Sequence, residues 1–115
     1  MQLQWYKSAG EWCLLDKVDS IGADRYGVFV VWRPGVGGRA PVVLYVGRGA
    51  LRHEIDRCRR DPVIGSSSDL RITWAKVDPL DVDGVAAYLY QHLRPLWGEL
   101  PVPVPAQPVN LPLSA

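Results

Sequence analysis

Two short apolar runs near the middle of the chain predict a pair of β-strands. Residues 27–32 are almost entirely apolar, and residues 42–46 repeat that character. β-branched and aromatic side chains of this kind suit a buried, pleated surface. The intervening segment 34–38 holds one proline and three glycines, which tolerate the backbone of a tight turn. We therefore expect an antiparallel hairpin whose second strand ends at Gly47.

Helical spacing follows the hairpin. Between residues 50 and 60, Leu51, Ile55 and Cys58 recur at i, i+4 and i+7, which predicts a helix with one narrow apolar stripe beneath a charged face. The sequence Asp61-Pro62 is expected to end this helix, because a residue before proline disfavours helical backbone.

A third strand and a second helix complete the predicted body. Apolar residues alternate over 70–77, which is typical of a strand with one buried face. Asp83 has the residue type of an N-cap, and apolar residues then recur at helical spacing up to Leu96, with Pro95 stopping the helix or bending its last turn. The order β-β-α-β-α predicts an α/β (α+β) fold with a three-stranded, mainly antiparallel sheet flanked by helices.

The two ends differ in composition from this body. Residues 1–24 are mixed and are expected to be an irregular lead-in that packs on the core, residues 25–97. Residues 98–115 contain five prolines, so they can form neither a helix nor a central strand. We expect a proline-rich strap that lies extended on the single domain, residues 1–115. The alternative is a groove, formed with Trp97, for a protein partner.

Charge and cysteine content narrow the functional classes. The net charge is +1, so attraction to nucleic acid must come from local clustering. Cys13 and Cys58 are expected to be reduced packing residues, and neither has zinc-ligand spacing with His53 or His92. No apolar run has the length of a membrane span or the character of a signal peptide. These features favour a cytoplasmic protein that does not insert into membranes.

Basic residues cluster around the first predicted helix. Five of the thirteen basic side chains fall between positions 48 and 60: Arg48, Arg52, Arg57, Arg59 and Arg60. Guanidinium groups bind phosphate in a bidentate way, so this cluster predicts a face that contacts nucleic acid. The alternative is a solvated helix face, partly neutralised by the acidic residues interspersed there.

An ordered set of short motifs resembles the GIY-YIG endonuclease family. Gly27-Val28-Phe29 stands where that family has its first signature tripeptide, and Tyr45-Val46-Gly47 matches the second one hairpin later. The longer runs 44–49, 72–75 and 109–112 resemble a small bacterial, stand-alone branch of the family. The resemblance covers roughly residues 20–112. It implies metal-assisted hydrolysis of phosphodiester bonds, with Mg²⁺ or Mn²⁺ as the ion.

The resemblance also implies a set of catalytic positions, most of which are substituted here. Tyr45 and Asn110 keep the residue type of the family. The other four positions differ, with Phe29 in place of a tyrosine, Glu54 in place of an arginine, Cys58 where relatives often have histidine, and Ala86 in place of the metal-binding glutamate. Loss of one preorganised charge-stabilising group typically costs about 10²–10³ in rate.

Neighbouring residues offer partial replacements. Arg57 lies three residues after Glu54 and would present a guanidinium on nearly the same helix face. Glu54 or Asp83 would have to supply the carboxylate for a metal ion. We therefore expect a nuclease-like domain with impaired catalysis that binds nucleic acid, or a partner, without efficient cleavage. The alternatives are a divergent Mg²⁺- or Mn²⁺-dependent endonuclease and a protein-interaction module.

Overall fold

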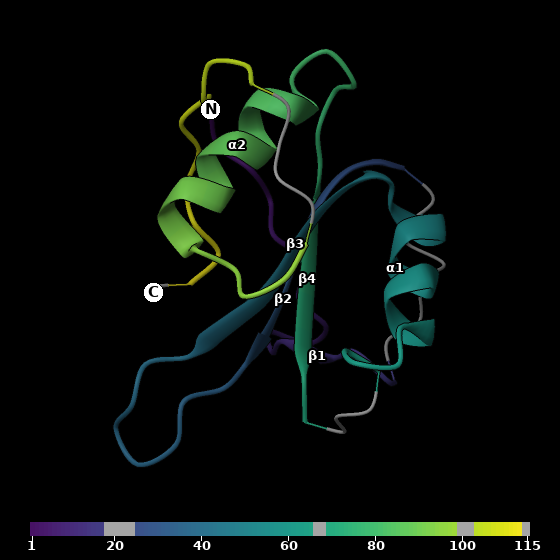
Figure 1. Ribbon diagram of the computed structural model, residues 1–115, viewed down its shortest axis with the longest axis vertical. Coiled ribbons are helices and arrows are strands. Elements are labelled where there is room, and N and C mark those ends of the chain that lie inside the picture. Colours follow the sequence, from purple (N-terminus) through teal and green to yellow (C-terminus); the bar gives the residue numbers. More distant parts are fainter. Residues whose placement is uncertain (18–24, 66–68, 99–102, 114–115) are drawn as a thin grey trace.

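The computed structural model describes residues 1–17, 25–65, 69–98 and 103–113. The elements among them are β1 (Cys13–Leu14), β2 (Tyr26–Arg33), β3 (Val42–Ala50), α1 (Leu51–Arg60), β4 (Arg71–Lys76) and α2 (Val82–Leu93). The strands form one antiparallel sheet in the order β1-β4-β2-β3. Figure 1 shows α1 on one side of this sheet and α2 on the other. The predicted α+β character and the β-β-α-β-α order of the body are confirmed.

The prediction of three strands is wrong, because the lead-in contributes a fourth. β1 pairs with β4 through Cys13 and Ile72. The same part of the chain makes further bonds beside β4, since the Tyr6 N–H donates to the carbonyl of Trp74 at 2.9 Å. Residues 18–24 of the lead-in lie outside the described residues. Two residues of mixed composition carry little periodic signal, and β1 exists because β4 offers it an unpaired edge.

The hairpin strand β3 does not stop at Gly47 as predicted. Pairing with β2 continues through Phe29–Gly47 and Gly27–Gly49 to Tyr26–Ala50. Gly49 has φ of +123°, which glycine adopts without steric cost. Long-range pairing therefore overrides the local tendency of glycine to end a strand.

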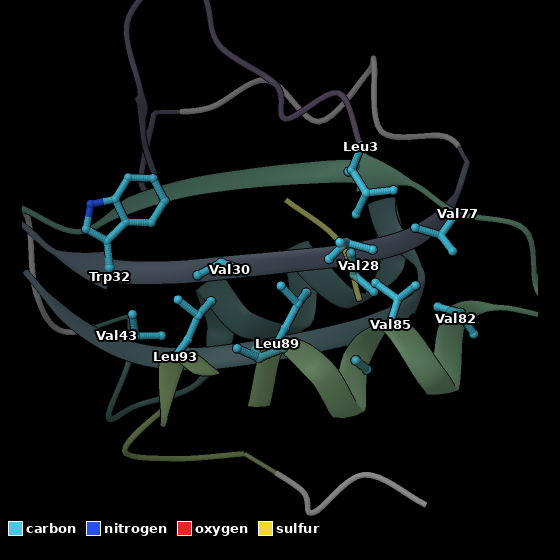
Figure 2. Packing of buried hydrophobic residues seen from close by; sticks show 14 residues of the cluster. Leu3, Val28, Val30, Trp32, Val43, Val77, Val82, Val85, Leu89 and Leu93 are labelled. Carbon is cyan, nitrogen blue, oxygen red and sulfur yellow. The ribbon is translucent and has the colours of Figure 1, made fainter. Parts of the chain in front are cut away.

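Two apolar clusters lie on opposite faces of the sheet. Val28, Val30 and Trp32 of β2 face α2, whereas Phe29 and Val31 face α1. Figure 2 shows the α2 side, where Val85, Leu89 and Leu93 pack against the alternate residues of β2. The prediction that the strand at 70–77 buries only one face is wrong, because Ile72, Thr73, Trp74 and Ala75 are all buried.

The bounds of α2 differ from those expected. The N-cap position is Asp81 rather than Asp83, because the N–H of Val85 already donates to the carbonyl of Asp81 at 3.0 Å. The helix ends at Leu93, and Arg94 takes a left-handed conformation with φ of 49° just before Pro95. Leu96 is therefore not on a buried helical face, and its side chain is 60% exposed.

The described ends of the chain pack together on the α2 side of the sheet. The side chain of Asn110 accepts from the N–H of Leu3 at 2.6 Å and donates to the carbonyl of Leu3 at 3.0 Å. Val109 is buried in the α2 cluster, and the N–H of Gln107 donates to the carbonyl of Gly84. Pro101 lies outside the described residues. Within the described part, no helix combines the length and apolar character needed to cross a membrane.

Candidate nucleic-acid interface

A groove runs along the seam between β3 and α1. Tyr45, Glu54 and Arg57 line two adjoining cavities there, of about 330 Å³ and 320 Å³. The first cavity continues to Cys58, Asp61 and the segment at Trp97 and is called the seam cavity below. The second extends along β3 to Arg48 and Tyr26.

A shift in strand pairing directs Tyr45 toward this seam. Val31 pairs with Tyr45 while Trp32 pairs with Val43, so Leu44 is an extra residue on β3. Such a bulge re-aims the side chains next to it. Leu44 and Tyr45, although consecutive, both pack with the α1 cluster, and the Tyr45 ring stacks on Phe29 with centroids 5.6 Å apart.

Phe29 and Gly47 together shape the wall behind Tyr45. Phe29 is fully buried, so the position where the family resemblance expects a tyrosine contributes packing and no hydroxyl. A Cβ on Gly47 would lie only 2.2 Å from Cζ of Phe29. Glycine at 47 is therefore required by the ring that it faces.

Two pairs of oppositely charged side chains lie along or beside the groove. Glu54 lies 3.6 Å from Arg57, and Asp83 of α2 lies 2.7 Å from Arg48 of β3. The Arg57 side chain is 65% exposed, so its guanidinium reaches solvent despite this partner. Arg57 thus does lie beside Glu54, as the helical spacing predicts.

Cys58 forms part of the floor of the seam cavity. Burial raises the pKa of its thiol to about 12, and the carboxylates of Asp61 and Glu54 contribute to the increase. The thiol therefore stays protonated near neutral pH, which disfavours thiolate nucleophilicity or metal binding. Cys58 and Cys13 are both free, and Cys58 is buried as a packing residue should be.

Two of the positions that the resemblance assigns to catalysis lie apart from this groove. Ala86 is buried in the α2 cluster and lines neither the seam cavity nor the second cavity. Asn110 holds Leu3 by two hydrogen bonds, and its own carbonyl accepts from the indole N–H of Trp5. In this structure the side chain of Asn110 ties the two ends of the chain together.

The arginines of the predicted basic cluster separate into different environments. Arg59 donates to the carbonyl of Leu15 at 2.9 Å and pairs with Asp56 at 3.2 Å, so it braces the lead-in against α1. Arg60 is exposed as the last residue of α1 and lines neither cavity of the groove. Arg52 is exposed at the first turn of α1 and lines a third cavity.

Three cations that sequence reasoning missed extend the groove. The third cavity, about 560 Å³, shares Tyr26 and Ala50 with the second and adds Arg25 and His53. A fourth, about 630 Å³, shares Arg25 and Leu51 with the third and adds Lys7 and Lys76. These three cations are isolated in sequence, so no local pattern signals them.

The second, third and fourth cavities adjoin one another around the start of α1 through shared lining residues, and together they are called the trough below. Six cationic side chains line it: Arg57, Arg48, Arg52, Arg25, Lys76 and Lys7. Among the described lining residues, Glu54 is a carboxylate of the second cavity and Asp56 is one of the third. No carboxylate lines the described part of the fourth cavity.

The residues present do not fit the divalent ion that the family resemblance implies. Glu54 and Asp83 are each paired with an arginine and lie on different helices. A guanidinium beside each carboxylate opposes the approach of a cation, and Mg²⁺ sites in proteins need oxygen ligands in near-octahedral arrangement. Among the described residues, no group of three or more His, Cys, Asp or Glu side chains is placed to hold a metal ion.

Comparison with known proteins returns no relative: no family model, no curated protein and no solved structure matches this chain.

Proposed function

We propose that this chain is a GIY-YIG-like domain that binds the phosphate backbone of nucleic acid without efficient cleavage. The observation that carries the proposal is the trough, in which folding gathers six cations from five separate parts of the sequence. A row of cations in a groove is the electrostatic footprint expected for a polyanion, whereas scattered surface charges need no such arrangement.

The distribution of charge supports a phosphate track rather than a solvated helix face. Lys7 comes from the lead-in, Arg25 directly precedes β2 and Lys76 ends β4, and all three line the fourth cavity, whose described lining residues include no carboxylate. At the other end the carboxylates of Glu54 and Asp83 offset Arg57 and Arg48. Phosphate groups would therefore bind most strongly beside Lys7 and Lys76, and more weakly toward the seam.

Impaired cleavage follows from the residues at the positions that the resemblance assigns to catalysis. Glu54 brings negative charge to the position where the resemblance expects a cation to stabilise the phosphoryl oxygens. Ala86 offers no ligand for a metal, and the neighbouring carboxylates are held by arginines. Catalytic groups must be correctly placed to act, so these substitutions favour binding over hydrolysis.

The salt dependence of nucleic-acid binding tests whether phosphate groups bind in the trough. For a single strand, the logarithm of the binding constant falls with the logarithm of salt concentration by about 0.7 for each phosphate contact. Lys76→Gln and Lys7→Gln should each weaken binding to a fluorescent oligonucleotide and lower this slope by about 0.7. Arg39→Gln is the matched control, since Arg39 lies in the hairpin loop that projects away from α1 (Figure 1). Equal losses in all three variants, or no binding at all, would contradict the trough as the binding surface.

Cleavage is tested separately with Mn²⁺. We expect no EDTA-sensitive product from single-stranded or duplex substrates, either with this chain or with Ala86→Glu. Cutting by the unaltered chain that is lost in Glu54→Gln would instead establish the divergent endonuclease. Cutting by Ala86→Glu alone would show that one missing carboxylate separates the scaffold from activity.

A further inference from the structure

The seam cavity differs in chemistry from the trough that it adjoins. Its lining includes two aromatic side chains, Tyr45 and Trp97, and two carboxylates, Glu54 and Asp61. Arg57 stands at the junction, because it lines both this cavity and the next one along β3. A phosphate chain in the trough would therefore reach a compartment with aromatic and acidic walls.

Trp97 is held in place although it is exposed. The backbone N–H of Trp97 donates to the carbonyl of Leu44 at 2.8 Å, and the backbone N–H of Leu96 donates to the carbonyl of Val43 at 3.2 Å. This segment therefore runs along the outer edge of β3. The Trp97 side chain nevertheless remains 42% exposed. Because the backbone is already ordered, binding of a ligand to this exposed ring has only the side-chain torsions of Trp97 left to fix.

The two carboxylates of the cavity act on the Cys58 thiol at its floor. Both Asp61 and Glu54 disfavour ionisation of that thiol. Oδ1 of Asp61 already accepts from the N–H groups of Val63 and Ile64. Glu54, whose side chain is 23% exposed, is the other carboxylate of the lining and offers a ligand a hydrogen-bond acceptor beside Arg57.

We propose that the seam cavity takes one unpaired nucleobase, with guanine preferred, from a strand whose phosphates lie in the trough. This inference rests on the proposed function, since it supplies the base that accompanies the bound backbone. The base stacks on Trp97 and directs its donor edge toward Glu54, while Arg57 contacts the adjoining phosphate.

The chemistry of the walls selects the base. A carboxylate only accepts hydrogen bonds. Guanine presents an amino group and a ring N–H side by side, whereas adenine and cytosine present one amino group each. Thymine and uracil flank their single N–H with two carbonyls, which the carboxylate repels. The volume of about 330 Å³ lies at the small end of the range of about 300–1,000 Å³ that is usual for ligand pockets, as suits a single base.

The first experiment varies one base and the aromatic wall. An oligothymidine carrying one central guanine should bind more tightly than the same strand with a central thymine or an abasic site. Base–aromatic stacking corresponds to about tenfold in affinity. Trp97→Ala should therefore remove about tenfold from guanine binding, and Trp97→Phe should retain most of it. Leu96→Ala is the matched control, because Leu96 is exposed beside Trp97 but does not line the cavity.

The second experiment tests the acidic wall through the ratio of affinities for the guanine and thymine strands. Glu54→Gln should raise affinity for both strands, because it removes the partner of Arg57, yet it should reduce their ratio toward one. Glu11→Gln makes the same charge change on the lead-in and should leave the ratio unaltered. A ratio that survives Glu54→Gln would overturn the assignment of the acceptor.

The results of these experiments distinguish failure of the base site from failure of phosphate binding in the trough. Salt-dependent binding that is equal for guanine, thymine and abasic strands would refute the base site while leaving the phosphate track intact. Failure of every strand to bind would refute both. Equal loss from Leu96→Ala and Trp97→Ala would identify an apolar docking surface in place of a base site.

Discussion

The Cys58 thiol links local packing to the charge of the candidate site. It is buried under α1 beside Asp61 and Glu54, and each of these neighbours makes a negative thiolate less favourable. The same residue could have been read from sequence as a histidine replacement with chemistry of its own. Its surroundings instead make it a packing residue beneath an acidic cavity.

Because folding raises the pKa of the Cys58 thiol, the free energy of unfolding should decrease at alkaline pH. The pKa of the Cys58 thiol rises from an ordinary value near 9 to about 12 on folding. Above the lower value the unfolded chain releases a proton that the folded chain retains, so stability falls by about 1.4 kcal/mol per pH unit between the two values. Denaturant unfolding at several pH values measures this slope.

Cys58→Ala should remove that part of the slope, and Cys13→Ala should not. An unfolding free energy that fell equally steeply in Cys58→Ala would show that other groups cause the alkaline loss.

At the scale of elements, local sequence patterns predicted which helices and strands form better than they predicted where each one begins and ends. The apolar stripe Leu51, Ile55, Cys58 predicted α1 correctly, because a helix with one buried face depends on spacing that neighbouring residues contain. The bulge at Leu44 and the extension of β3 past Gly47 depend on how β2 pairs, which the local pattern does not contain. The orientation of Tyr45 was therefore beyond reach of the sequence pattern.

The start of α2 has a measurable consequence for binding. Asp83 lies in the first turn and holds Arg48 at 2.7 Å, with both side chains partly exposed. Asp83→Asn should free Arg48 for phosphate and raise the salt slope of single-strand binding by about 0.7. The cost in stability should stay below about 1 kcal/mol, as for other exposed pairs.

Asp81→Asn provides the control. It makes the same charge change two residues earlier, at the N-cap position, where the carboxylate makes no capping hydrogen bond. A gain in affinity from Asp81→Asn as large as that from Asp83→Asn would mean that net charge, and not release of Arg48, controls binding.

At the scale of the whole molecule, the two ends of the chain close one face of the sheet. Leu3 and Val109 both belong to the α2 cluster, and Asn110 joins their segments by hydrogen bonds. The resemblance assigns Asn110 to the catalytic site, but its side chain here serves the closure of the fold. Residues 107 positions apart in sequence meet there.

Asn110→Ala should therefore reduce stability and leave binding intact. Two lost hydrogen bonds and the stranded backbone groups of Leu3 correspond to about 2 kcal/mol in unfolding free energy. Gln107→Ala, on the same segment, removes only an exposed contact between the side-chain amide and the sulfur of Met1 and should change stability little. Loss of nucleic-acid affinity in a fully folded Asn110→Ala protein would show that Asn110 contributes to binding as well as to stability.

By itself the sequence determined the β-β-α-β-α order of the body, the hairpin and the apolar stripe of α1, because each depends on the pattern of neighbouring side chains. Tertiary structure decided the fourth strand, the two-sided burial of β4, the direction of Tyr45 and the pairing of Arg48 with Asp83. It also brought Lys7, Arg25 and Lys76 together. These features join residues that are distant along the chain, and a local pattern carries no information about which distant residues will share a surface.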